Sequence, residues 1–334
     1  MEQTRFIYLD TKHWIQLARA RFGLRGGEAF QPALQAVERA VTERQALFPF
    51  GMVSIYETLN TPDPEQRKRL AHVMVSLSGN TVLATPEEVV PKEIANAVSQ
   101  VLGRELPFPD LSPFRSGLIR AFRTEEQARR ERYDLLASLA LHIPIDTLFK
   151  RAERAFAEVE SEVGTFQILA GGDEQSRQAT LSGLRETADR IRDGTELFRR
   201  SPQGHGRQNR FDGYLREYLR SNRDSIVDAF HHMGGDFDAF EQTGASAFAQ
   251  LFERVPYIDV QIKLSVERDQ NLRREIASND IPDTIHMGMA IPYCYAVGGD
   301  RYTVHIIRKT SLDAKYGTLV FRELDELTSL LNSG

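Results

Sequence analysis

Both ends of the chain alternate short apolar runs with stretches of helical periodicity, whereas the middle shows helical periodicity almost alone. Near the N-terminus the apolar runs cover residues 6–9, 52–53 and 81–84. Near the C-terminus two further runs, at residues 296–298 and 318–321, alternate with helical patterns at residues 283–290, 301–312 and 322–331. Short buried strands separated by helices favour a parallel sheet with helices on its faces.

The middle of the chain contains few strand patterns and no repeat of fixed period, which argues against a solenoid. Its periodicity predicts helices at residues 125–142, 145–169, 174–200 and 211–233. We therefore predict an α/β protein whose parallel sheet, flanked by helices, is interrupted by a large all-α insertion. Residues 1–88 would form the first part of the core, residues 89–276 the insertion and residues 277–334 the second part.

Composition narrows the class of protein further. The chain has 334 residues, so we expect one large domain or two interleaved ones. Its single cysteine, Cys294, excludes an internal disulfide and a zinc site with several cysteines. No apolar run reaches the length of a membrane helix, and we expect a soluble, cytoplasmic protein. The net charge of −5 means that nucleic acid would have to bind at local basic patches.

Four acidic residues lie at predicted strand ends or at the starts of helices beside strands. They are Asp10, Glu57, Asp283 and Asp300. Ligands gather at the carboxyl ends of strands in open α/β sheets. Carboxylates held together repel one another unless a cation offsets their charge, and Mg²⁺ or Mn²⁺ suits oxygen ligands. The alternative is that these acids are separate helix caps and surface groups; Ser54 and Glu57, for example, have capping-box spacing.

The segments around these acids resemble PIN-domain ribonucleases. The resemblance rests on IYLDTKHW, VSIYETLN, NDIPDTIHMGMAIPYC and VGGD, and covers about residues 4–85 and 278–332. It implies a PIN-like sheet and a Mg²⁺ or Mn²⁺ site that cuts single-stranded or structured RNA. Two positions depart from the pattern: Tyr295 and Gly299 replace an Asp and a Thr that similar proteins often carry.

The resemblance also implies roles for individual residues. Asp10, Asp283 and Asp300 would bind the metal and share catalysis with Glu57. Asp280 competes with Asp283 for the third position; Asp283 is preferred because it is expected to begin its helix, with Asp280 capping or supporting it. Apart from the resemblance, Lys12 is one candidate for the group that steadies the leaving oxygen. Two histidines, His13 and His286, either contact metal-bound water or substrate or are packed and hydrogen-bonded in the interior.

A second segment, residues 198–220, interleaves arginines with aromatic residues. That mixture suits RNA, because arginine pairs with phosphate and aromatic rings stack on unpaired bases. The candidate contacts are Arg199, Arg200, Arg207, Arg210 and Tyr214. The alternative is that these aromatic rings face a helical core.

Together these features predict a metal-dependent endoribonuclease. Its insertion would select RNA, form homo-oligomers or bind a regulatory protein, as in a toxin–antitoxin or defence setting. Two alternatives use the same sequence: a catalytically inactive PIN-like scaffold with a helical protein-interaction module, and a metal-dependent nucleotide phosphatase. DNA stays open as a substrate, because nothing in the sequence reads a 2′-hydroxyl.

Overall fold

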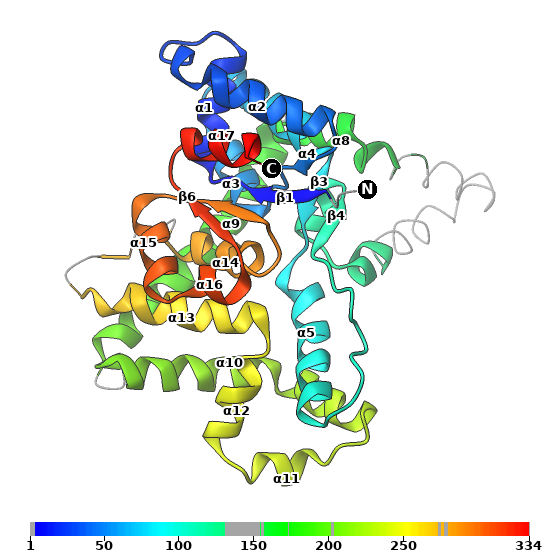
Figure 1. Ribbon diagram of the computed structural model, residues 1–334, viewed down its shortest axis with the longest axis vertical. Helices are drawn as coiled ribbons and strands as arrows, with labels where there is room; N and C mark the ends of the chain where they lie inside the picture. Colours follow the sequence, from blue (N-terminus) through cyan, green and yellow to red (C-terminus); the bar gives the residue numbers. More distant parts are fainter. Residues whose placement is uncertain are drawn as a thin grey trace.

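The computed structural model describes residues 4–130, 154, 157–172, 174–201, 204–272, 275–276 and 280–333 (Figure 1). The helix predicted at residues 125–142 and the first part of the one at residues 145–169 fall largely outside these residues. Helix α8 (Glu162–Leu169) is the described remainder of the latter. In the described part of the chain, no helix combines the length and apolarity needed to cross a membrane.

The central sheet joins the two ends of the chain. Its four strands, all parallel and in the order β2-β1-β5-β6, are Ala46–Leu47 (β2), Arg5–Tyr8 (β1), Ala296–Gly298 (β5) and Leu319–Phe321 (β6). Tyr8 of β1 pairs with Val297 of β5, although the two lie far apart in sequence. The α/β class, with a parallel sheet flanked by helices, is therefore observed.

Two predicted strands of the N-terminal part are corrected by the structure. Residues 52–53 are the first turn of helix α3 (Met52–Asn60), because an apolar run of two residues carries no period that separates helix from strand. Residues 81–83 do form strand β3 (Thr81–Leu83), but it pairs antiparallel with β4 (Phe114–Ser116) in a separate two-stranded sheet. Strand β4 lies within the segment that was predicted to be all-α.

One face of the central sheet is covered by helices from the two ends of the chain, drawn above the sheet in Figure 1. They are α1 (Thr11–Arg21), α2 (Gln31–Thr42), α4 (Pro64–Ser78) and α17 (Leu324–Asn332), with η1 (Glu28–Phe30) between α1 and α2. Side chains alternate along a strand, so Ile7 and Leu9 join this core while Tyr8 joins the core on the other face.

The helical middle of the chain supplies most of the second core. That core brings Tyr8 and Val297 of the sheet together with α5 (Pro86–Val101), α10 (Arg207–His232), α12 (Ala245–Phe252), α13 (Pro256–Gln270), α14 (Asp280–Ala290) and α15 (Arg301–Lys309). The remaining described helices are η2 (Leu118–Ala121), α9 (Glu174–Arg200), α11 (Phe237–Glu241) and α16 (Leu312–Tyr316). Helix α5 crosses the boundary expected at residue 88, and α13 packs along α14.

Candidate acidic active site

Two of the four acids occupy matching positions at one edge of the sheet. Asp10 lies two residues past β1, at the N-cap position of α1, and Asp300 lies two residues past β5, at the N-cap of α15. Because β1 and β5 are parallel neighbours, their carboxyl ends meet at the same edge. The Asp300 carboxylate accepts a hydrogen bond from the Thr303 amide at 2.6 Å, whereas Asp10 makes no capping bond to its helix.

The other two acids come from helices that pack beside this edge. Glu57 lies on α3, and the hydroxyl of Thr11 on α1 donates a hydrogen bond to its carboxylate. Asp283 lies in the first turn of α14. This helix begins at Asp280 and not, as predicted, at Asp283. Both aspartates line one small cavity together with Asp300. The capping box predicted for Ser54 and Glu57 is absent, because Ser54 lies inside α3 and the N-cap is Gly51.

Electrostatics show that these carboxylates lie close enough to sense one another. Burial, and then the charge of Asp300, raises the pKa of Asp10. Burial and the charge of Asp10 raise the pKa of Glu57. The pKa of Asp283 lies well above its usual value because of burial and the negative charges of Asp10, Glu57, Asp300 and Asp280. Four segments of the chain thus converge on one acidic site, which we call the acid site.

The acid site offers only carboxylate oxygens, a donor set that fits a hard divalent cation such as Mg²⁺ or Mn²⁺. The repulsion among these groups also fits, because a shared cation would relieve it. Within the described residues, however, no group of three or more His, Cys, Asp or Glu side chains is placed to hold a metal ion as it stands. The donor chemistry, and not a ready-made ligand geometry, supports a metal here.

His286 connects three elements of the site from the interior. The Val53 amide, in the first turn of α3, donates to Nε2 of His286 at 2.9 Å, and Nδ1 lies 3.2 Å from the Tyr8 hydroxyl. Burial lowers the pKa of His286 to about 4, so the ring is neutral and its Nδ1–H donates to Tyr8. Gly51 is required beside it, since a Cβ there would lie 2.3 Å from the ring. His286 therefore fixes the helix of Glu57 against the helix of Asp283.

His13 and Lys12 contact β6 and the residues that precede α17. The Nε2 of His13 donates to the carbonyl oxygen of Arg322 at 2.9 Å, and the ring packs against Phe321. Burial lowers the pKa of His13 to about 4, so this ring is also neutral and has a packing role. Lys12 Nζ lies 3.5 Å from a carboxylate oxygen of Glu323, and its charge also lowers the pKa of Asp10.

Two residues of the site carried no signal in the sequence. Tyr8 is buried, and its pKa is raised well above the usual value by burial and by the charges of Asp10, Asp283 and Glu57. Arg268 of α13 is also buried and lines the cavity of Asp283. It donates to the Asp269 carboxylate at 2.8 Å and to the Thr284 hydroxyl of α14 at 3.2 Å. A helix of the middle segment thus reaches the acid site.

The predicted RNA-binding segment is mostly an internal surface. Arg199 and Arg210 are buried, with exposed fractions of 2% and 4%, and the Tyr214 hydroxyl donates to Asp269. Arg200 and Arg207 are exposed, but each is paired: Arg200 with Glu196 at 3.2 Å and Arg207 with Glu267 at 3.0 Å. These side chains do not assemble into one basic surface.

The two departures from the PIN pattern lie outside the group of acids. Tyr295 precedes β5, so it lies at the edge of the sheet opposite Asp300, where the Arg5 guanidinium covers its ring at 5.1 Å. Gly299 follows β5, and its amide donates to the carbonyl oxygen of Phe321 at 3.1 Å. Neither position removes one of the four acids that converge.

Fold and site together define an α/β protein with an acid cluster at the carboxyl edge of a parallel sheet. Comparison of the chain with protein-family models, with curated proteins and with solved structures gave no significant match in any of the three.

Proposed function

We propose that the protein is a metal-dependent endoribonuclease, with Mg²⁺ or Mn²⁺ held by Asp10, Asp283 and Asp300 and with Glu57 beside them. The observation that carries the proposal is the raised pKa of Asp283, caused by burial and by four other acids. Carboxylates that disfavour one another's ionisation in this way are common where a protein binds a cation or moves protons. The resemblance of these segments to PIN-domain ribonucleases supports the same reaction.

In the proposed hydrolysis, Asp10, Asp300, Glu57 and Lys12 have different roles. A bound divalent ion supplies Lewis acidity and an activated water in such sites. Asp10 and Asp300, on adjacent strand ends, would hold such an ion, and its positive charge would orient the scissile phosphate. Glu57 has a raised pKa and is the group that accepts the proton of the attacking water at a carboxylate oxygen. As the new bond to phosphorus forms, the bond to the leaving oxygen breaks, and Lys12 stabilises the charge on that oxygen.

The size of the cavity favours a polymer over a mononucleotide. The cavity lined by Asp280, Asp283 and Asp300 has a volume of about 40 Å³, enough for water molecules but not for a nucleoside. A nucleotide phosphatase would need room for the base and the sugar near the acids. A strand that lies across the surface needs only its phosphate to reach them.

The test is cleavage of a labelled single-stranded oligoribonucleotide by the full chain in Mn²⁺ and in EDTA. We expect cleavage in Mn²⁺ alone, and its loss in Asp10→Asn and Asp283→Asn. Asp224→Asn is a matched control, because Asp224 is exposed on α10 and changes the net charge equally. A DNA strand of the same sequence shows whether the 2′-hydroxyl matters.

Two outcomes would replace the proposal. If the wild-type chain neither cuts RNA nor gains thermal stability in Mn²⁺, the inactive-scaffold alternative is correct. If it releases phosphate from mononucleotides and leaves the oligonucleotide intact, the protein is a phosphatase.

A further inference from the structure

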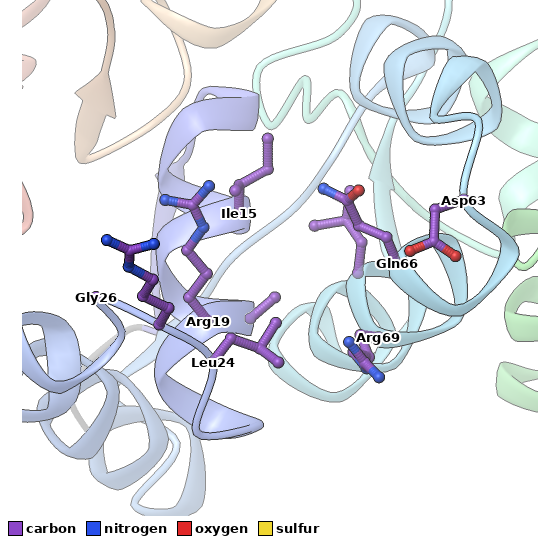
Figure 2. Close-up of a pocket in the computed structure, with 10 residues that line it drawn as sticks. Ile15, Arg19, Leu24, Gly26, Asp63, Gln66 and Arg69 are labelled. Atoms are coloured by element: carbon purple, nitrogen blue, oxygen red, sulfur yellow. The ribbon is translucent and has the colours of Figure 1, made fainter.

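A second hollow lies between α1 and α4, on the other side of α1 from His13. Its volume is about 570 Å³, and Arg19 of α1 faces Gln66 and Arg69 of α4 across it (Figure 2). Arg25, in the loop after α1, also lines it, and the apolar surface comes from Ile15, Ala18, Leu24 and Leu70. We call Arg19, Arg25, Arg69 and this apolar surface the arginine hollow.

The three arginines of the hollow have no partner among the described residues. Within the described residues, no ion pair or hydrogen bond involves the guanidinium group of Arg19, Arg25 or Arg69. Asp63 is the single acid that lines the hollow, and its carboxylate accepts a hydrogen bond from the Glu65 amide at 2.9 Å as the N-cap of α4. Three cations against one committed carboxylate leave a net positive hollow in a chain whose net charge is −5.

Neighbouring arginines on the same two helices show that pairing is available there. Arg21 of α1 lies 3.3 Å from the Glu38 carboxylate and donates to the Ser76 hydroxyl at 2.9 Å. Arg67 of α4 is buried and donates to the carbonyl oxygens of Thr61 and Pro62 at 2.7 and 3.0 Å. Of the four arginines on α1 and α4, the two that line the hollow, Arg19 and Arg69, are the ones without a partner among the described residues, so their guanidinium groups are available to an anion from outside the chain.

The loop that carries Arg25 is fixed by the end of α1. Gly23 has φ +59°, and the Leu24 amide donates to the Arg19 carbonyl at 2.9 Å, as in a Schellman motif. The loop then turns back through Gly27, whose amide donates to the Leu24 carbonyl at 2.8 Å. A Cβ at Gly27 would lie 2.3 Å from the carbonyl oxygen of Arg19, so the loop packs directly on the helix.

The arginine hollow continues one wall of the acid site. Thr11, Ile15 and Arg19 follow one another at four-residue spacing and therefore share one face of α1. Thr11 donates to Glu57 at one end of this face, and Arg19 lines the hollow at the other. Nine residues of helix separate Asp10 from Arg19, about 13 Å at 1.5 Å per residue. A single strand of a few nucleotides spans that distance.

We propose that the arginine hollow binds backbone phosphates of the single-stranded nucleic acid whose scissile bond lies at the acid site. This inference rests on the proposed nuclease function. Guanidinium groups match phosphate oxygens in charge and geometry, and Ile15 and Leu24 offer an apolar surface to a sugar or base. The hollow would hold the strand at a fixed distance from the bond that is cut.

The test measures binding apart from cleavage. The full chain in EDTA is titrated against a fluorescein-labelled single-stranded oligoribonucleotide, and anisotropy is recorded over a range of salt concentrations. For Arg19→Gln/Arg69→Gln we expect affinity to fall about tenfold or more. The slope of log affinity against log salt should become shallower by about 0.7 for each phosphate that the variant no longer neutralises. Arg39→Gln/Arg216→Gln is the control, because both arginines are exposed, line neither site and remove the same charge.

The outcomes separate this proposal from the proposed function. An equal decrease in affinity in the control and hollow variants would overturn the hollow as a specific site, even if metal-dependent cleavage persists. Arginine-dependent binding of inorganic phosphate or a mononucleotide, without binding of the oligonucleotide, would also overturn it and assign a small anion instead. Arginine-dependent oligonucleotide binding without cleavage would support the hollow and reject the nuclease. Equal thermal melting midpoints of the variants exclude misfolding as the cause.

Discussion

Asp259 and Asp283 differ in how the structure compensates the charge of the carboxylate. Asp259 of α13 is 3% exposed, and its carboxylate is 2.8 Å from both Lys263 Nζ and Lys315 Nζ and 2.9 Å from the Tyr316 hydroxyl. Asp283 is surrounded instead by other carboxylates, and their charges raise its pKa further than burial alone. The chain therefore pairs Asp259 directly with two lysines, whereas the arginine that lines the cavity of Asp283, Arg268, donates to Asp269 and Thr284.

The contrast separates a carboxylate that the fold neutralises from one that lies among like charges. Burying a carboxylate costs free energy unless a positive charge or hydrogen bonds offset it. At Asp259 the compensation is internal and complete. At the acid site Lys12 lowers the pKa of Asp10 but also lies 3.5 Å from Glu323, and Arg268 donates to Asp269. Uncompensated charge lowers stability. It is typical of functional sites, where proteins keep locally unfavourable arrangements of residues.

The largest expected effect comes from replacing Glu57, the proposed proton acceptor. Glu57→Gln keeps the shape of the side chain and removes its basicity, so we expect the cleavage rate to fall about 10²- to 10⁴-fold. Single-turnover cleavage in saturating Mn²⁺ measures it. The matched change Asp259→Asn should leave the rate per folded molecule unchanged. A rate that survives in Glu57→Gln would remove Glu57 from the mechanism.

Asp259→Asn should instead lower the free energy of unfolding. It leaves Lys263 and Lys315 without their carboxylate, and we expect a decrease of about 1–3 kcal/mol, since both lysines keep partial access to water. Urea unfolding of wild type and variant checks it. An unchanged midpoint would mean that the internal pairing of Asp259 does not contribute to stability. Asp259 would then no longer be an example of a carboxylate that the fold uses for stability.

Asp283→Asn should have the opposite sign from Asp259→Asn. Because the charges of Asp10 and Glu57 disfavour ionised Asp283, a neutral amide relieves repulsion. We expect the thermal midpoint in EDTA to rise by about 1–3 °C, and the increase caused by Mn²⁺ in wild type to disappear. Differential scanning fluorimetry with and without Mn²⁺ measures both. A lower midpoint in EDTA would contradict the repulsion inferred here.

The sequence predicted the acids better than the groups that hold them in place. Asp10 and Asp300 follow apolar runs, and strand ends in a parallel sheet meet at one edge, so their convergence followed from local pattern. The contact of His286 with Val53 joins segments 233 residues apart and has no local signature. The half-exposed strand β4 likewise lacked an apolar run that could have marked it as the partner of β3.

The smallest expected effect concerns the difference in thermal midpoint between Asp283→Asn and wild type. We expect this difference to change with pH. The folded state raises the pKa of Asp283, so the folded chain holds its proton to higher pH than the unfolded chain does. Stability from the protonated carboxyl is therefore complete below about pH 4 and is lost as pH rises through the folded pKa. The asparagine side chain is neutral at every pH, so the variant does not lose this stability. Its thermal midpoint should therefore equal that of wild type at pH 4 and exceed it increasingly towards pH 8.

Titrating groups that do not interact with Asp283 cancel in this comparison. Burial raises the pKa of Glu93 to about 7 and lowers that of His286 to about 4, but both residues are present in wild type and variant. Thermal midpoints from pH 4 to 8 in EDTA therefore report the ionisation of Asp283 together with that of the acids it interacts with, Asp10, Glu57, Asp300 and Asp280. Saturating Mn²⁺ should flatten the curve, because a cation lowers the pKa of the carboxylate it binds. A difference that is constant with pH would show that Asp283 ionises normally in the folded chain, and the acid site would then be as well compensated as Asp259.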